Sequence, residues 1–191
     1  MKFLGTLTLV FLTLILFSCD STDTSIISTE NPTQEISDSA KPIVYTTQTG
    51  FALTKEINGL LGGEINFDST LIDENNDTVT IQIALVFDAN SFSGTQQITI
   101  VPDANTGSIQ FTPAMVFNKP AKLDLEYSGI NLTNLGFTSN STIDFVYMAD
   151  NGNIEYILKN ECKIKWNNQR LYVKKAELPH FSRYAFVRKS S

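Results

Sequence analysis

The chain has few residues of the kinds that usually perform catalysis or bind metals. Its 191 residues include one histidine, His180, together with two cysteines and one tryptophan. A zinc site needs several cysteine, histidine or carboxylate ligands, so this scarcity excludes a His-rich or Cys-rich cluster. Charged residues make up only 18% of the chain, and the formal net charge of −6 argues against nucleic acid as a partner. We therefore expect neither a metal nor a cofactor.

Long apolar runs are also missing, except at the start of the chain. A basic residue follows Met1, residues 3–17 are predominantly apolar, and the small Ser18 precedes Cys19. A transmembrane helix needs about 20 apolar residues, so this run is short for a span and has the order of an export signal. We assign residues 1–18 as a signal peptide.

Residues 16–19, Leu-Phe-Ser-Cys, resemble the lipobox of bacterial lipoproteins. The resemblance implies cleavage before Cys19 and acylation of its thiol, for example with palmitate, and of the new amino terminus. Several acyl chains anchor a protein stably, since each buried methylene contributes about 0.8 kcal/mol. The chain is thus expected in the bacterial cell envelope, at the outer membrane or cell surface, bound to the membrane through lipid on Cys19. An unmodified cysteine in an ordinary signal peptide is the alternative.

Residues 19–59 are predicted to be the lipidated cysteine and a polar linker. From Asp20 to about Pro42 the chain is dominated by Ser, Thr, Asp and Glu, without a sustained apolar period. Such a segment buries too little apolar surface to offset its ordering entropy. If Cys19 carries lipid, Cys162 has no partner for an intramolecular disulfide. Its alternation with Ile164 and Trp166 predicts that Cys162 faces inward.

Residues 60–191 are predicted to form the folded domain. Apolar and polar residues alternate there in short segments separated by Asp, Asn and Gly, which is typical of strands joined by tight turns. The predicted strands are residues 63–67, 79–85, 97–101, 108–112, 123–127, 142–148, 153–158, 162–166, 171–175 and 181–187. About ten short strands at this spacing indicate an all-β fold, an antiparallel β-sandwich.

These segments resemble, in their order, the ZU-five domain, a β-sandwich of ankyrins and netrin receptors that also occurs in bacterial surface proteins. The resemblance covers residues 62–189. It rests on Gly62-Gly63, the strands between 79 and 100, the blocks 109–114 and 117–123, and the closing block 180–185, His-Phe-Ser-Arg-Tyr-Ala. Residues 87–91 depart from the family's turn, and the hairpin at 73–77 is an addition.

Some members of the resembled family cleave themselves between Phe and Ser of this closing block. The resemblance implies that the Ser182 hydroxyl would attack the Phe181 carbonyl with His180 as general base, and that water would hydrolyse the ester. The reaction needs a strained turn that holds the hydroxyl at attack distance. We favour the alternative, in which the tripeptide begins the last strand and Phe181 and Tyr184 are core residues.

Other motifs point to solvated surface. Asp73, Asn75 and Asp77 have the spacing of a calcium loop, but Thr78 replaces the required glycine, so a plain hairpin is expected. The carboxylate pair Asp124 and Glu126 shows no sign of a pocket. The basic stretch 161–191 predicts a sheet face in contact with water, with a polyanionic partner as the lesser alternative.

Three functions are consistent with the sequence. The leading one is an interaction or structural module without enzymatic turnover, whose partner is a protein or a cell-surface glycan. The second is a self-cleaving domain that cuts once between Phe181 and Ser182. The third is a polysaccharide-binding module that uses exposed aromatic residues. Candidates for those aromatic residues are Tyr45, Phe92, Tyr156 and Tyr172.

Overall fold

The structure is a computed structural model that describes residues 43–47, 50–149, 151, 153–157 and 159–189. The predicted signal peptide, Cys19 and the linker up to residue 42 lie outside the described residues. The strands are β1 (Ile43–Thr47), β2 (Gly50–Asn58), β3 (Gly63–Ile72), β4 (Thr78–Phe87), β5 (Thr95–Asp103), β6 (Ser108–Ser128), β7 (Ile143–Met148), β8 (Ile154–Tyr156), β9 (Glu161–Lys165) and β10 (Arg170–Arg188). A short 3-10 turn, η1 (Trp166–Asn168), joins β9 to β10. Within these ranges no helix is long or apolar enough to cross a membrane.

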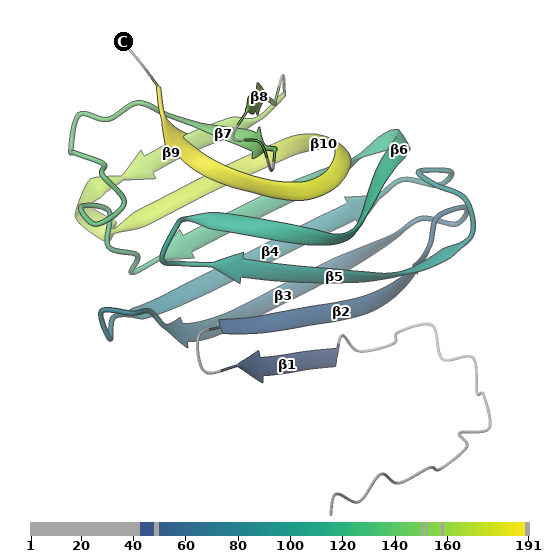
Figure 1. Cartoon of the computed structure of the whole chain (residues 1–191), viewed down its shortest axis with the longest axis horizontal. Helices are drawn as coiled ribbons and strands as arrows, with labels where there is room; N and C mark the ends of the chain where they lie inside the picture. The colour runs from purple at the N-terminus through teal and green to yellow at the C-terminus, as the bar shows by residue number, and fades with distance from the viewer. Residues whose placement is uncertain (1–42, 48–49, 150, 152, 158, 190–191) are drawn as a thin grey trace, which may run out of the picture. The chain divides into compact units, whose positions relative to one another are not determined.

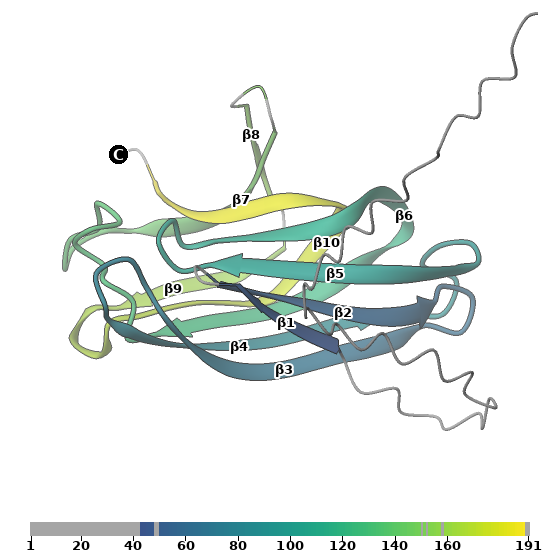
Figure 2. The ribbon, with the colours of Figure 1, turned by 60° about the horizontal axis from the view of Figure 1, so that its bottom comes forward.

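The ten strands form one antiparallel sheet that folds over into two layers (Figures 1 and 2). The first layer contains β3, β4, the C-terminal half of β6, the N-terminal half of β10, and β9. The second layer contains β1, β2, β5, the N-terminal half of β6, the C-terminal half of β10, β7 and β8. The predicted all-β sandwich is therefore confirmed.

Strands β6 and β10 run through both layers as one paired ribbon. Their pairing is antiparallel from Arg170 opposite Ser128 to Ala185 opposite Ser108. Three irregularities in register interrupt the pairing and allow the ribbon to bend. At the first, Lys174 and Lys175 together lie opposite Asp124, whose carboxylate accepts a hydrogen bond of 2.8 Å from the Lys175 amide.

The predicted strands differ from the observed ones mainly at this ribbon. The segments 108–112 and 123–127 are two halves of β6, and 171–175 and 181–187 are two halves of β10. The alternation of apolar and polar residues breaks where the ribbon bends, although the backbone remains extended and paired. Periodicity therefore gives four short strands where the structure has two long ones.

The predicted boundary at residue 60 is wrong because β2 belongs to the sandwich. Residues 53–58 of β2 pair with residues 95–100 of β5 in the second layer. Phe51, Leu53 and Ile57 are buried in the core. The segment assigned to the end of the linker is thus a strand of the domain, and β1 pairs with its outer side.

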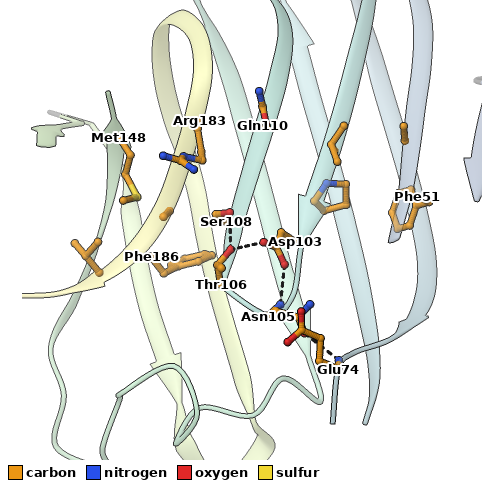
Figure 3. Close-up of a pocket in the computed structure, with 15 residues that line it drawn as sticks. Phe51, Glu74, Asp103, Asn105, Thr106, Ser108, Gln110, Met148, Arg183 and Phe186 are labelled. Carbon is orange, nitrogen blue, oxygen red and sulfur yellow. Dashed lines mark hydrogen bonds between the residues drawn. The ribbon is translucent and has the colours of Figure 1, made fainter. Parts of the chain in front are cut away.

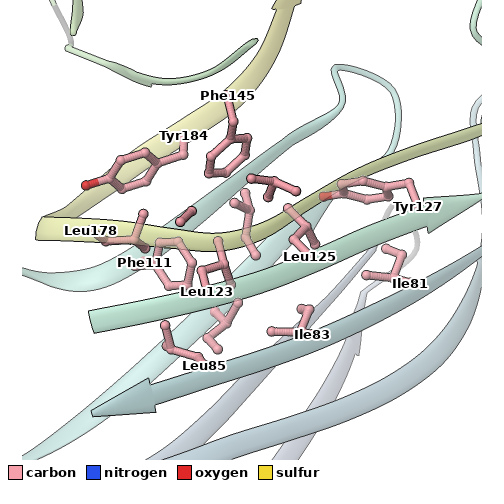
Figure 4. Close-up of a cluster of buried hydrophobic side chains, with 14 of the residues drawn as sticks. Ile81, Ile83, Leu85, Phe111, Leu123, Leu125, Tyr127, Phe145, Leu178 and Tyr184 are labelled. Carbon is pink, nitrogen blue, oxygen red and sulfur yellow. The ribbon is translucent and has the colours of Figure 1, made fainter. Parts of the chain in front are cut away.

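The core lies between the two layers. On β4 the apolar positions alternate with polar ones, and Ile81, Ile83 and Leu85 face inward. Figure 4 shows these side chains together with Leu123, Leu125 and Tyr127 of β6, directed toward residues of the second layer such as Phe145 and Tyr184. Because alternate residues of a strand point to opposite faces, every second residue enters this core.

We predict that Leu53→Ala destabilises the domain strongly, because Leu53 is fully buried in β2. A buried Leu→Ala change typically costs about 2–5 kcal/mol of unfolding free energy. Leu60, in the turn after β2, is 55% exposed, so Leu60→Ala is a matched control that should change stability by less than about 0.5 kcal/mol. Urea unfolding of both variants measures the difference. Equal stabilities would contradict the placement of β2 in the core.

Candidate functional site

A groove of about 660 Å³ crosses the outer face of the second layer. It is lined by residues of β2, β5, β6, β10 and β7 and by two turns at one end of the sandwich. Figure 3 shows Arg183, Gln110 and Met148 toward one end, and Asp103, Asn105 and Glu74 toward the other. Its volume is within the range of small-ligand sites, which is about 300–1,000 Å³.

The strand register places the groove residues in rows across the sheet. In one row, Gln110 of β6 lies between Val101 of β5 and Arg183 of β10, and Met148 of β7 follows Arg183. In the next row, Ser108 lies between Asp103 and Ala185. Ser108 and Ala185 are small and buried, whereas the longer Gln110 and Arg183 of the first row are exposed.

Arg183 is the cation of this groove. Its side chain is exposed, and among the described residues no carboxylate forms an ion pair with it. An arginine presents five N–H donors in a planar fork that matches a carboxylate or phosphate. The neighbouring Gln110 amide, also exposed, adds a further donor and acceptor. This end of the groove is therefore suited to an anionic group of a ligand.

The other end of the groove is a rigid turn between β5 and β6. The Asp103 carboxylate accepts hydrogen bonds from the Asn105 amide, at 2.9 Å, and from the Thr106 hydroxyl, at 2.7 Å. The Asn105 side chain accepts a hydrogen bond of 3.0 Å from the Glu74 amide in the β3–β4 turn. Since the Asp103 oxygens are already bonded, Glu74 is the exposed carboxylate at this end.

The floor of the groove is tied to the core. The Tyr127 hydroxyl, fully buried, donates a hydrogen bond to the backbone carbonyl of Ser108. Burial raises the pKa of the Tyr127 hydroxyl above its ordinary value, so it remains a donor. The Ser108 hydroxyl bonds to that of Thr106 at 2.8 Å. Both contacts fix the backbone on which the groove is built.

The tripeptide His180, Phe181 and Ser182 lies in β10 at the bend of the ribbon, outside the groove. Phe181 is buried, with its ring stacked on Phe111 at 4.7 Å between centroids and edge-on to Phe117 at 4.7 Å. Phe181 is thus a central residue of an aromatic cluster. The expected core positions of Phe181 and Tyr184 are confirmed.

The backbone around His180 and Ser182 is extended strand. None of residues 179–184 has a positive φ, and the chain through Phe181 and Ser182 is extended. Among the described residues, the hydrogen bonds of His180 go to Tyr184, whose hydroxyl donates to the His180 carbonyl, and not to Ser182. The His180 ring lies edge-on to Tyr147 at 4.5 Å, and its Nε2 is 3.9 Å from the Glu155 carboxylate.

Of the aromatic residues considered for polysaccharide binding, the three whose side chains the structure describes lie in different parts of the sandwich. Phe92 is buried against Phe87 and Phe117, so its expected exposure is wrong. Tyr156 is exposed on β8 of the second layer, while Tyr172 is half-buried on β10 in the first layer, beside Arg170 and Lys165. The side chain of Tyr45 lies outside the described residues.

The remaining acidic motifs stabilise turns and sheet faces. Asp73 accepts hydrogen bonds from the Asn75 and Asp77 amides, as in a plain hairpin turn. Asp124 and Glu126 form ion pairs with Lys174 and Arg170. Among the residues that the structure describes, no group of three His, Cys, Asp or Glu residues could hold a metal ion.

The groove residues were not found from the sequence. In the sequence, Arg183 belongs only to the basic stretch and to the closing block. Val101, Gln110, Arg183 and Met148 come from four strands, and only the pairing register brings them into one row. No local signal marks such a row.

Comparison with protein-family models, with curated proteins and with solved structures found no match to this chain. The resemblances to the lipobox and to the ZU-five domain therefore stay predictions.

Proposed function

We propose that the protein is a lipid-anchored binding module of the bacterial cell envelope and that it has no enzymatic turnover. Its groove holds an extended segment of a protein partner, and Arg183 binds a carboxylate of that segment. The observation that carries this proposal is an exposed arginine without a carboxylate partner among the described residues, at one end of a groove. Such an arginine is a typical anchor of a polar interface.

The lining of the groove favours a peptide over a saccharide. Saccharide platforms present the face of an exposed aromatic ring, but the aromatic residues of this lining, Phe51 and Phe186, are buried. Val101 is exposed and Met148 is partly exposed, so apolar surface lies beside Arg183. Methionine adapts its shape to varied partners. Val101, Met148 and Arg183 together fit a peptide segment in which an apolar side chain stands next to an acidic one.

The hydroxyl groups of the groove are engaged in holding its turn. Its lining contains neither histidine nor cysteine. The Ser108 hydroxyl bonds to that of Thr106, which donates to the Asp103 carboxylate, and the same carboxylate accepts from the Asn105 amide, so these groups hold the β5–β6 turn together. These features support binding rather than covalent catalysis at this site.

The lipid anchor is tested by Cys19→Ala. In cells given a palmitate analogue, we expect the parent protein to be labelled and to sediment with membranes, and the variant to lose the label. Cys162→Ala is the matched control and should be labelled like the parent, because Cys162 lies in β9 of the folded domain. Labelling of the Cys19→Ala variant would contradict lipidation at this cysteine.

The binding groove is tested by photocrosslinking in the cells that produce the protein. Gln110 and Gln82 are both exposed, but Gln110 lines the groove and Gln82 lies in the first layer, on β4. With p-benzoylphenylalanine at position 110, we expect a discrete crosslinked species. The same residue at position 82 should give none.

Arg183→Gln in the position-110 variant should reduce the crosslinked species at least about tenfold, because a charge-assisted hydrogen bond contributes about 1.5–3 kcal/mol. Arg188→Gln is the charge-matched control, since Arg188 is exposed near the end of the same strand but does not line the groove. Crosslinks that survive Arg183→Gln, or that are equal at positions 110 and 82, would overturn the proposed site. A crosslink to a glycan instead of a protein would favour the polysaccharide alternative.

The self-cleaving alternative is tested by intact mass under denaturing conditions. Because the Phe181–Ser182 bond lies in an extended strand, we expect the parent and its Ser182→Ala variant each to keep residues 182–191. Loss of these residues from the parent alone would establish autoproteolysis and assign His180, Phe181 and Ser182 to a functional site.

A further inference from the structure

The turn between β2 and β3, residues 58–62, presents two leucines to the solvent. Leu60 is 55% exposed and Leu61 is 79% exposed. Val116, at the bend of β6, is also 79% exposed, so Leu61 and Val116 are the most exposed large apolar residues that the structure describes. These side chains do not contribute to the core. We call residues 58–62 the leucine turn.

The leucine turn and the bend of β6 lie at the same end of the sandwich, the end toward which β2 and β4 run (Figure 1). The Asn90 amide, in the loop after β4, donates a hydrogen bond of 3.2 Å to the Leu60 carbonyl. The Asn118 amide, at the bend, donates one of 2.7 Å to the Ser91 carbonyl in the same loop. The loop therefore links the turn to the bend, and the exposed apolar residues of both are at one end.

The leucine turn is held rigidly, and its backbone amides are bonded within the protein. The side-chain oxygen of Asn58 accepts hydrogen bonds from the amides of the two leucines, at 3.0 and 3.3 Å. The Asn58 carbonyl accepts one from the Gly62 amide at 2.9 Å, and the Gly59 amide donates to the Gly94 carbonyl at 2.8 Å. A Cβ at Gly59 would lie 2.3 Å from the Phe92 carbonyl oxygen, so the turn packs closely against the loop. Because unbonded amides are costly in lipid, this turn is suited to an apolar medium.

This end of the sandwich carries little charge. Residues 57–63 and 89–97 contain no charged residue. Glu56 and Glu64, on either side of the leucine turn, belong to the flanking strands β2 and β3. Asp88, which precedes the loop, forms an ion pair of 2.7 Å with a lysine of β6. Contact of the turn and the loop with a bilayer would therefore bury no carboxylate of either segment, which would be costly.

The direction of β1 brings the proposed lipid anchor to the same end. β1 is antiparallel to β2, with Ile43 opposite Thr54 and Thr47 opposite Gly50. The chain therefore enters β1 from the side on which β2 ends, and the leucine turn follows β2 directly. Residues 20–42 separate Cys19 from β1 and span at most about 80 Å even when fully extended. A lipid on Cys19 would thus keep the leucine turn within reach of the bilayer.

We infer that the leucine turn inserts into the interface of the phospholipid bilayer to which the protein is anchored, and that this contact orients the domain. Burial of Leu60 and Leu61 among the acyl chains removes apolar surface from water. The inference rests on the proposed lipid anchor, because two leucines bury too little area to hold a protein on a membrane alone. β5 runs from this end to Asp103, so the acidic end of the groove stays open to a partner.

The test is photocrosslinking of the full chain in the cells that produce it. With p-benzoylphenylalanine at position 61, we expect an adduct whose mass, measured on the crosslinked peptide, is that of a phospholipid. The same residue at position 72 is the matched control and should give no such adduct. Ile72 is also an exposed apolar residue, 53% exposed, but it lies at the other end of β3.

A second substitution tests whether the adduct depends on an apolar turn. In the position-61 variant, Leu60→Asp should reduce the phospholipid adduct at least about tenfold, because a carboxylate is costly within a bilayer. Ile72→Asp in the same variant adds the same charge at the other end and should leave the adduct unchanged. Leu60 and Ile72 are both exposed, so both chains should fold, and a thermal melt of each purified chain verifies this.

Palmitate labelling of the same cells separates this inference from the anchor on which it rests. A labelled chain without a phospholipid adduct at position 61, or with equal adducts at positions 61 and 72, would overturn the membrane contact and leave the anchor intact. An adduct at position 61 in an unlabelled chain would overturn the anchor but not the contact. A protein adduct at position 61 in place of a lipid would assign the turn to a protein interface and overturn the inference.

Discussion

The pairing of β6 with β10 is the constraint on which the rest of the structure depends. Each strand contributes one half to each layer, so the ribbon holds the two layers together through backbone hydrogen bonds. The other strands add to its sides: β4 and β5 pair with β6, and β7 and β9 pair with β10. A paired ribbon can bend where a few residues do not take part in the regular strand pairing and the pairing resumes beyond them. The irregular register near Lys175 and on either side of His180 provides such residues.

The same ribbon decides which side chains enter the core and which face the solvent. Near its bend, Phe181 enters the aromatic cluster with Phe111 and Phe117. Beyond the bend, Tyr184 is buried while Arg183 faces the groove. Within the motif 180–182, Phe181 thus fills space where the layers join. Arg183 is the residue of this block on which the proposed function rests.

The local alternation of apolar and polar residues was sufficient to predict the fold class. Where it missed a strand, the reason is physical. On β4, strict alternation of Val79, Ile81, Ile83 and Leu85 gave the strand almost to its ends. On β2, Lys55 occupies a position on the same side as Phe51, Leu53 and Ile57, which hides the alternation. Its long side chain reaches past the core, and its ammonium group donates to the Glu64 carbonyl at 3.0 Å. A charged residue in an inward position therefore made a strand of the domain look like linker.

The candidate groove could not be predicted in this way, because it depends on a charge that remains after the fold has paired the others. The basic stretch appears uniform in the sequence, yet Arg170, Lys174 and Lys175 each have an acidic partner, supplied by β6 or β9. Arg183 and the lysines of β9 have none among the described residues. Paired surface charges contribute little to binding, since a ligand would have to displace their partners, whereas unpaired ones beside apolar surface can accept an anion directly. The unpaired charge of Arg183 is therefore the feature of this sheet face to which the proposed anionic ligand would bind.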